Sequence, residues 1–267
     1  MRIERLAPSP TGYLHLGHAF SMLKIYQNIQ KYNGIIKMRI DDLDYSRCSE
    51  IFIKNIIEDI NWLNIPISKN IYRQSENHYN YLTELKKLFE IGVVYKCICT
   101  RKDIKEVLSA PHINNLRTKK REVYPQTCKN KVLPKKDYCL RINLEKAIQL
   151  IDEKDLFFIE EGEGPNGERG MQKFSKNYLI ETFGDFVIAR KDIKTSYNLS
   201  TVFDDDNQKI THVTRGNDLF ELSKIQVFLQ LLLKKQRNIY NHHKLIKDYK
   251  GNKLSKRNMP TSLKEYR

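Results

Sequence analysis

The stretch RIERLAPSPTGYLHLGHAFSMLKIYQNIQKY, residues 2–32, decides the fold. Residues 2–7 are predicted to form a short strand, and the prolines and glycine of PSPTG (8–12) favour a turn. Apolar residues then recur at helical spacing, so a helix is expected to begin between His15 and His18. IIKMRI (35–40) predicts a second strand. Strand, helix and strand form a βαβ unit, which indicates a parallel sheet and a Rossmann-like, doubly wound α/β fold.

Further elements are expected along the rest of the chain. Two amphipathic helices are predicted over 49–64 and 76–91. Their apolar faces contain Trp62 and Leu63 in the first helix, and Tyr81, Leu85 and Leu88 in the second. FGDFVIARKD (183–192) and SYNLSTVFDDD (196–206) are read as sheet, and 222–233 as an apolar helix. Residues 162–170 and the part from 251 onward are predicted to be loops.

A change of composition divides the chain. Residues 95–140, which contain CICTR, RTKKR and YPQTC, are predicted to form an inserted α+β subdomain of basic character. The segments 1–94 and 141–267 on either side are then expected to form one catalytic domain.

Composition points to a polyanionic partner. The 267 residues include 47 Lys and Arg against 32 Asp and Glu, a net charge of +15, which favours nucleic acid. The alternative is the codon bias of an AT-rich genome, since Lys, Ile and Asn are all frequent. No segment resembles a signal peptide or a membrane span, and the five cysteines include a CxC pair. We therefore expect a cytoplasmic, monomeric protein in which cysteines bind metal rather than form disulfides.

Two short motifs at opposite ends of the chain suggest adenylate chemistry together. HLGH (15–18) opens a helix after a first strand, where phosphates meet helix N-terminal amides, although alone it also fits an ordinary helix surface. Gly17 would allow close approach of a nucleotide. KLSK (253–256) supplies two lysines on a glycine-flanked loop, although lysine-rich tails are usually solvated. Attack by a carboxylate on the α-phosphate of ATP needs positive charge on the departing phosphates and no general base.

The two motifs and four blocks between them resemble class I glutamyl-tRNA synthetases. RLAPSPTGYLHLGH (5–18) is similar to the first signature of that family, and KLSK to the second. MRIDDLDYSR (38–47), YRQSE (72–76), SYNLSTVFDD (196–205) and ITHVTRGNDLF (210–220) match further family blocks in the same order. The resemblance covers essentially the whole chain and implies L-glutamate, ATP and Mg2+ as ligands.

Within that family the wording RGNDLF and the short continuation after KLSK resemble the glutamyl-Q tRNA(Asp) synthetases. This branch implies transfer of activated glutamate to the queuosine base at the wobble position of tRNA(Asp). Two alternatives stay open: a catalytic fragment of a glutamyl-tRNA synthetase that charges the 3′ end of tRNA(Glu), and a non-catalytic tRNA-binding paralogue.

The resemblance also implies roles for individual residues. Glutamate would be bound by Arg5, Ala7, Ser9, Asp41, Tyr197 and Arg215, with Asp41 at the ammonium and the last two at the side-chain carboxylate. ATP would be bound by His15, Gly17, His18 and Lys256, and catalysis would use His15, His18, Lys253 and Lys256. Two positions depart from the family: Asp41 stands in place of Glu, and Thr201 in place of the Asn of full-length enzymes.

The insertion contains a CxC…YxxxC pattern. Cys97, Cys99, Tyr124 and Cys128 would complete a tetrahedral, structural zinc site, although buried metal-free cysteines are the alternative. Cys48 and Cys139 are expected to be core thiols without partners. RTKKR (117–121) and the lysines at 129, 131, 135 and 136 form a basic patch that would contact tRNA phosphates or remain a solvated loop. His242 and His243 are expected to pack near the substrate rather than bind metal.

Overall fold

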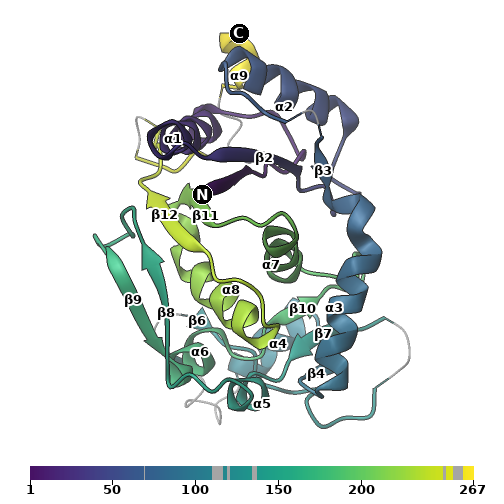
Figure 1. Ribbon diagram of the computed structural model, residues 1–267. Coiled ribbons are helices and arrows are strands. Elements are labelled where there is room, and N and C mark those ends of the chain that lie inside the picture. The colour runs from purple at the N-terminus through teal and green to yellow at the C-terminus, as the bar shows by residue number, and fades with distance from the viewer. Residues whose placement is uncertain (69, 110–116, 119–120, 134–136, 249–250, 255–260) are drawn as a thin grey trace.

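A parallel sheet forms the centre of the N-terminal half of the chain (Figure 1). The computed structural model describes residues 1–68, 70–109, 117–118, 121–133, 137–248, 251–254 and 261–267. Strands β1 (Ile3–Leu6), β2 (Ile35–Ile40) and β3 (Tyr72–Arg73) pair in parallel, with β2 in the middle. Helix α1 (Leu16–Tyr32) connects β1 to β2, so the predicted βαβ unit is confirmed.

A second group of strands lies on the other side of β1. Strands β11 (His212–Gly216), β12 (Ile239–His243) and β8 (Asp155–Glu160) are parallel, and β9 (Gly170–Ser175) closes the edge antiparallel to β8. The N–H of Thr211 donates to the Ile3 carbonyl at 2.9 Å, which brings the start of β11 against β1. The order of strands therefore reverses between β1 and β11, and open α/β sheets bind ligands at the carboxyl ends of the strands flanking such a point.

Helices cover both faces of these strands, as a doubly wound fold requires. Helices α1 and α2 (Glu50–Trp62) share an apolar cluster with Leu6, Met38 and Ile40. Helices α7 (Tyr197–Asn207) and α8 (Phe220–Leu232) share another cluster with Val213 and Tyr240. Helix α3 (His78–Glu90) follows a short 3-10 turn, η1 (Gln74–Asn77), and a second such turn, η3 (Asn217–Leu219), precedes α8. The Rossmann-like fold class is confirmed.

Two features of the helices differ from the sequence prediction. Residues 197–207 form a helix rather than a strand, because Ser196 caps its N-terminus and Leu199 and Val202 bury one face. Trp62 is 45% exposed at the end of α2, so it does not belong to the apolar face of that helix. The loop predicted over 162–170 is confirmed up to residue 169, and strands β8 and β9 flank it as an antiparallel pair.

The final residues pack against the beginning of α1 rather than forming a loop throughout. Helix α9 (Leu263–Tyr266) begins with a capping box in which Ser262 and Glu265 exchange hydrogen bonds. The Leu263 N–H donates to the Leu14 carbonyl at 2.8 Å, and the Leu263 side chain is fully buried. Ser262 forms an antiparallel bridge with His15.

A separate antiparallel sheet contains β10 (Val187–Ala189), β7 (Cys139–Ile142) and β4 (Val94–Cys97) in that order. Helices α4 (Arg101–Ser109), α5 (Leu144–Gln149) and α6 (Lys176–Phe183) and a hairpin of β5 (Arg117–Thr118) and β6 (Arg121–Glu122) accompany it. This sheet takes β10 from beyond residue 140, and its apolar residues share one cluster with α8. The insertion boundaries at 95 and 140 stay a prediction.

Candidate active site

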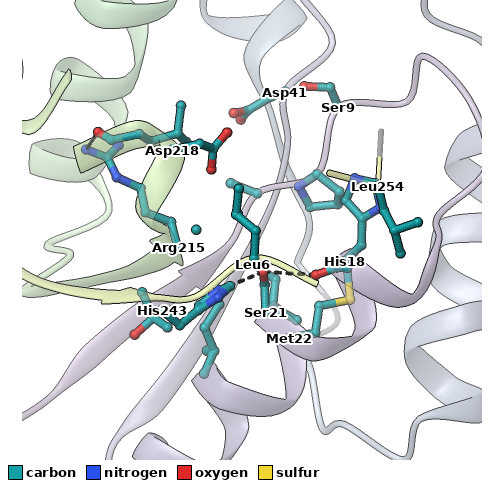
Figure 2. Close-up of a pocket in the computed structure, with 18 of the residues that line it drawn as sticks. Leu6, Ser9, His18, Ser21, Met22, Asp41, Arg215, Asp218, His243 and Leu254 are labelled. Carbon is teal, nitrogen blue, oxygen red and sulfur yellow. Dashed lines mark hydrogen bonds between the residues drawn. The ribbon is translucent and has the colours of Figure 1, made fainter. Parts of the chain in front are cut away.

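A cavity of about 630 Å³ opens where the chain leaves β1, β2, β11 and β12 (Figure 2). In Figure 2, Asp41 and Ser9 lie on one side of it, Arg215 and Asp218 on another, and His18 near Leu254. The cavity is lined by ten of the residues predicted from the sequence: Arg5, Ala7, Ser9, His15, Gly17, His18, Asp41, Tyr197, Arg215 and Lys253. Lys256 lies outside the described residues. Segments from both ends of the chain therefore meet around one hollow.

The two histidines of HLGH cap the first turn of α1 through their rings. The Gly17 N–H donates to Nδ1 of His15 at 3.1 Å, and the His15 N–H donates to Nδ1 of His18 at 3.1 Å. A nitrogen that accepts a hydrogen bond has no proton, so each neutral ring has its proton on Nε2. Such rings donate to phosphate oxygens without adding a buried charge. A Cβ on Gly17 would lie 2.9 Å from Cε1 of His15, so glycine also makes room for that ring.

A chain of alternating charges runs beneath one side of the cavity. Arg5 donates through Nε to Oδ1 of Asp205 at 3.0 Å, and Arg39 donates through Nη1 to the same oxygen at 2.7 Å. Arg39 also donates through Nε to Oδ1 of Asp41 at 2.8 Å. Burial raises the pKa of Asp41, and the neighbouring Arg39 opposes this rise. The sequence blocks contained Arg39 and Asp205, but no pattern in the sequence indicated that they join Arg5 to Asp41.

Asp204 fastens α7 to the segment that contains YRQSE. Its carboxylate accepts hydrogen bonds from the Tyr72 hydroxyl at 2.7 Å, from Nε2 of Gln74 at 2.6 Å and from the Tyr81 hydroxyl at 2.9 Å. Burial raises the pKa of Asp204 to about 6 despite these donors and the nearby Arg39. This network holds the helix that begins with Tyr197, a residue of the cavity wall. Thr201, one turn further on, is 1% exposed and is not among the cavity-lining residues.

Arg215 is fixed from behind by three groups. Its Nε donates to Nε2 of His242 at 3.2 Å, and its Nη2 donates to Oγ of Ser223 at 2.8 Å and to the Leu219 carbonyl at 3.3 Å. Its Nη1 is buried and has no hydrogen-bond partner among the residues that the structure describes. Sequence reasoning did not find Ser223, and it placed His242 only loosely near the substrate.

The segment of the second motif reaches the same cavity. Lys253 forms an antiparallel bridge with Lys247 across a turn in which Gly251 has φ +81°. The Lys253 ammonium pairs with Asp218, which also lines the cavity. His243 lines it as well, and its Nε2 lies 2.8 Å from Oγ of Ser21 on α1. Asp218 stands in the RGNDLF block and His243 was expected near the substrate, but the sequence prediction gave neither residue a specific role.

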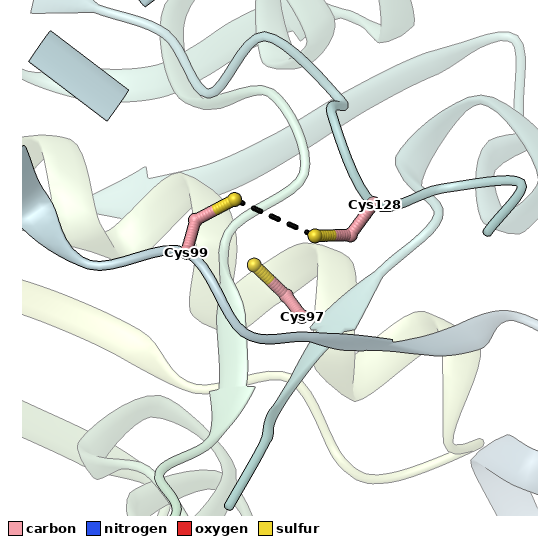
Figure 3. Close-up of side chains that lie close together, drawn as sticks. All are labelled: Cys97, Cys99 and Cys128. Carbon is pink, nitrogen blue, oxygen red and sulfur yellow. Dashed lines mark hydrogen bonds between the residues drawn. The ribbon is translucent and has the colours of Figure 1, made fainter. Parts of the chain in front are cut away.

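The predicted zinc ligands meet at the end of β4 (Figure 3). The sulfur atoms of Cys97, Cys99 and Cys128 all lie within 4.8 Å of one another. The Tyr124 hydroxyl lies 3.2 Å from the Cys97 sulfur and 3.5 Å from the Cys99 sulfur. Ligands about 2.3 Å from a tetrahedral zinc ion are separated by about 3.8 Å, so the four donors fit such an ion after small movements.

Cys139 has a partner, contrary to the sequence prediction. It pairs with Cys97 in the register of β4 and β7. Hydrogen bonds from Cys139, Tyr124 and Arg141 lower the pKa of Cys97 to about 4, although burial opposes them. This lowering of the pKa favours the thiolate of Cys97, which is the form that binds metal.

The predicted basic patch is described only in part. Lys119, Lys120, Lys135 and Lys136 lie outside the described residues. Lys129 forms an ion pair with Glu145 at 2.6 Å, so its charge is already matched by a carboxylate. Contact of this patch with tRNA stays a prediction.

Comparison with known proteins decides the family. Residues 3–267 match the model for tRNA synthetases class I (E and Q), catalytic domain. The chain belongs to this family. His15 and His18 of HLGH and Lys253 of KLSK, which line the cavity, thus belong to a class I synthetase catalytic domain, whose family uses ATP.

Two curated proteins are similar in sequence to this chain. The chain is 39% identical to the glutamyl-Q tRNA(Asp) synthetase of Rhodobacter capsulatus, over 99% of this chain and 94% of that protein. It is 34% identical to the glutamate–tRNA ligase of a Hydrogenobaculum species, over 98% of this chain and 54% of that protein. The chain thus spans nearly all of the first relative and about half of the second.

A solved structure supports the fold. A glutamate tRNA ligase from Elizabethkingia meningosepticum in complex with its amino acid superposes with a TM-score of 0.73 at 23% identity, over 96% of this chain and 52% of that one. In the described part of this synthetase chain, no helix is long and apolar enough to cross a membrane.

Proposed function

We propose that this class I synthetase chain activates L-glutamate with ATP and transfers it to the queuosine base at the wobble position of tRNA(Asp). One observation supports it most: one cavity joins the HLGH rings and Lys253 to Asp41 and Arg215, a carboxylate and a guanidinium. The relative from Rhodobacter capsulatus, which is similar over nearly its whole length, favours queuosine as the acceptor.

In the activation step the α-carboxylate of glutamate attacks the α-phosphorus of ATP. A new P–O bond forms, the bond to the β-phosphate oxygen breaks, and pyrophosphate leaves with the bonding electrons. Because the carboxylate is already ionised at neutral pH, no residue has to remove a proton. The Nε2–H groups of His15 and His18 donate to the phosphates, and Lys253 and Lys256 balance the growing charge on pyrophosphate. ATP enters as its Mg2+ complex.

Recognition of glutamate divides between two sides of the cavity. The Asp41 carboxylate faces the substrate ammonium, and its charge is anchored by Arg39. Asp41 has one methylene less than the Glu that is usual in the family. The ion pair with Arg39 fixes the position of its carboxylate. Arg215 offers its unsatisfied Nη1 to the side-chain carboxylate, with Tyr197 beside it. Arg5, Ala7 and Ser9 complete the wall around the amino acid.

In the transfer step a hydroxyl of the queuosine cyclopentenediol attacks the carbonyl carbon of the adenylate. An ester bond forms, AMP leaves, and the hydroxyl proton passes to solvent.

We further propose that Cys97, Cys99, Tyr124 and Cys128 hold a structural Zn2+ that fastens 124–128 to β4. A single chain in the cytoplasm, where tRNA is available, is sufficient for this function.

A charging assay tests the proposal. Labelled glutamate is expected on queuosine-containing tRNA(Asp) and on neither tRNA(Asp) without queuosine nor tRNA(Glu). Label on the 3′ end of tRNA(Glu) would instead support the alternative that the 34% identity to a glutamate–tRNA ligase favours. Absence of glutamate-dependent pyrophosphate exchange, with and without tRNA, would support a non-catalytic tRNA-binding paralogue.

A further inference from the structure

A buried chain of three side chains, Glu160, His242 and Arg215, leads from the end of β8 to the wall of the cavity. We propose that Glu160 and His242 are positioning residues that aim the guanidinium of Arg215 and thereby make the site accept glutamate and reject glutamine. This inference rests on the proposed function, because it assumes that Arg215 meets the side-chain carboxylate of the substrate.

The hydrogen bonds define one protonation state. Oε2 of Glu160 lies 2.5 Å from Nδ1 of His242, and Oε1 of Glu160 accepts from the His242 N–H at 2.8 Å. A carboxylate oxygen accepts, so the imidazole proton is on Nδ1. Nε2 of His242 therefore has a lone pair, which accepts from Nε of Arg215 at 3.2 Å. Burial and the charge of Arg215 both lower the pKa of His242, and the carboxylate of Glu160 opposes them.

The side chains of Glu160, His242 and Arg215 are all buried. Glu160 is 2% exposed, His242 is 1% exposed and Arg215 is 6% exposed, so bulk water does not compete for these hydrogen bonds. The backbone following β8 also approaches β12 very closely. A Cβ on Gly162 would lie 2.1 Å from the His242 carbonyl oxygen, so glycine is required for this approach. The Gly162 N–H donates to Oε1 of Glu160 at 2.8 Å and holds that carboxylate in place.

Within the described chain, one nitrogen of the Arg215 guanidinium is left to bind a ligand. Nε is engaged by His242, and Nη2 by Ser223 and the Leu219 carbonyl. Nη1 is left without a hydrogen-bond partner among the described residues, on a side chain that lines the cavity. A guanidinium only donates, so it pairs with either oxygen of a carboxylate. The amide of glutamine also accepts through its oxygen, but it has no negative charge and therefore pairs less strongly with a buried guanidinium than a carboxylate does.

The test measures discrimination rather than activity alone. Pyrophosphate exchange with the full chain gives KM and kcat for glutamate, glutamine and ATP. His242→Ala is expected to raise the KM for glutamate about 10-fold to 100-fold, because a hydrogen bond to a charged group is lost. The ratio of kcat/KM for glutamate over glutamine falls with it, while the KM for ATP stays within about 2-fold. Glu160→Gln keeps an acceptor for Nδ1–H, so its effect is expected to be smaller than that of Glu160→Ala.

A neighbouring carboxylate–histidine pair provides the matched control. Glu161 and His212 lie 3.7 Å apart, Glu161 pairs with Arg2 and not with Arg215, and neither residue lines the cavity. Glu161→Gln and His212→Gln are therefore expected to leave both KM values and the discrimination ratio unchanged.

Each outcome decides the inference. Folded His242 and Glu160 variants that keep the wild-type KM for glutamate and its preference over glutamine overturn it. An equal change in the constants for glutamate and ATP also overturns it, since the pair would then only stabilise the fold. If the alanine variants unfold, His242→Gln and Glu160→Asp are measured with the same criteria. Failure of the wild-type chain to activate glutamate refutes the proposed function itself. If Arg215→Ala is defective while the Glu160 and His242 variants behave like the wild type, only the role of Glu160 and His242 is refuted.

Discussion

The imidazole rings of His15 and His18 lie 3.9 Å apart between centroids, and each ring accepts a backbone N–H of the same helical turn. The rings thus have two functions at once. They cap α1 through Nδ1, and they present Nε2 as the protonated nitrogen. A change of residue type can separate these functions.

His15→Asn is expected to keep α1 capped and to abolish adenylate formation. Asparagine is among the best N-cap residues, whereas it has no group equivalent to Nε2–H at the phosphates. His15→Ala should lose both functions and cost about 1 kcal/mol in the free energy of unfolding. Urea unfolding and pyrophosphate exchange measure the two effects. An active His15→Asn variant would contradict the role of the ring as a phosphate donor.

Lys256→Ala is expected to abolish adenylate formation while glutamate binding stays close to wild type, since the lost charge acts on pyrophosphate. Calorimetric titration with glutamate and pyrophosphate exchange test the two halves of this prediction. Lys264→Ala serves as the control, because that ammonium lies over the Tyr13 ring on the surface. Near-normal activation by Lys256→Ala would show that the loop has another role.

Arg215→Ala should raise the KM for glutamate far more than the KM for ATP, because the proposed function assigns this guanidinium to the side-chain carboxylate of glutamate. The comparison variant is Arg190→Ala, since the Arg190 side chain is 43% exposed and pairs with Asp192 away from the cavity. Steady-state pyrophosphate exchange provides both constants. Equal effects on glutamate and ATP would remove Arg215 from the glutamate side of the site.

Metal analysis of the purified protein should find about one zinc ion per chain. Cys128→Ala is expected to lose that zinc and to lower the melting temperature, since a structural metal stabilises the fold that contains it. Cys139→Ala should retain it, because Cys139 lies outside the cluster of three thiols. A fully folded wild-type protein without metal would refute the zinc site.

Asp204 should make stability depend on pH. Burial raises the pKa of this carboxyl from 3.8 to about 6 in the folded chain. Between roughly pH 4 and pH 6 the folded chain keeps a proton that the unfolded chain loses. Its contribution is therefore fully present below about pH 4 and declines as the pH rises through about 6, by about 3 kcal/mol in total.

Urea unfolding at several pH values compares the wild type with Asp204→Asn, which cannot titrate. The stability of the wild type relative to the variant is expected to fall between roughly pH 4 and pH 6 and then to level off. A difference that stays constant across this range would show that the pKa of Asp204 is not raised.

The sequence predicts this fold well where local chemistry and periodicity agree. The turn at 8–12 and the helical spacing after His15 located β1, α1 and β2 within a few residues. The strand predicted over SYNLSTVFDDD (196–206) was wrong. Its β-branched and aromatic residues favour a strand, whereas the Ser196 cap and a buried helical face determine its structure. The placement of Trp62 on the apolar face was wrong because a large apolar side chain at a helix end can remain exposed.

The predicted site lacked the residues that act through others. The resemblance implied roles for His15 and Arg215, whereas Arg39, Asp205, Glu160 and His242 contribute through hydrogen bonds to other side chains. Except for the contact between Arg39 and Asp41, they join residues that are far apart in sequence, so neither spacing nor composition can indicate them. Cys139 illustrates the same limit, because its contact with Cys97 depends on the register of two antiparallel strands.

The docking of Leu263 against Leu14 also has a consequence for biosynthesis. During translation the HLGH turn leaves the ribosome early, but its support from Ser262 and Leu263 is among the last parts of this sequence to emerge. β11, which flanks β1, is also made late. A nascent chain interrupted before these segments lacks Arg215 and Lys253 as well as the contacts of Ser262 and Leu263, so it cannot assemble the complete cavity.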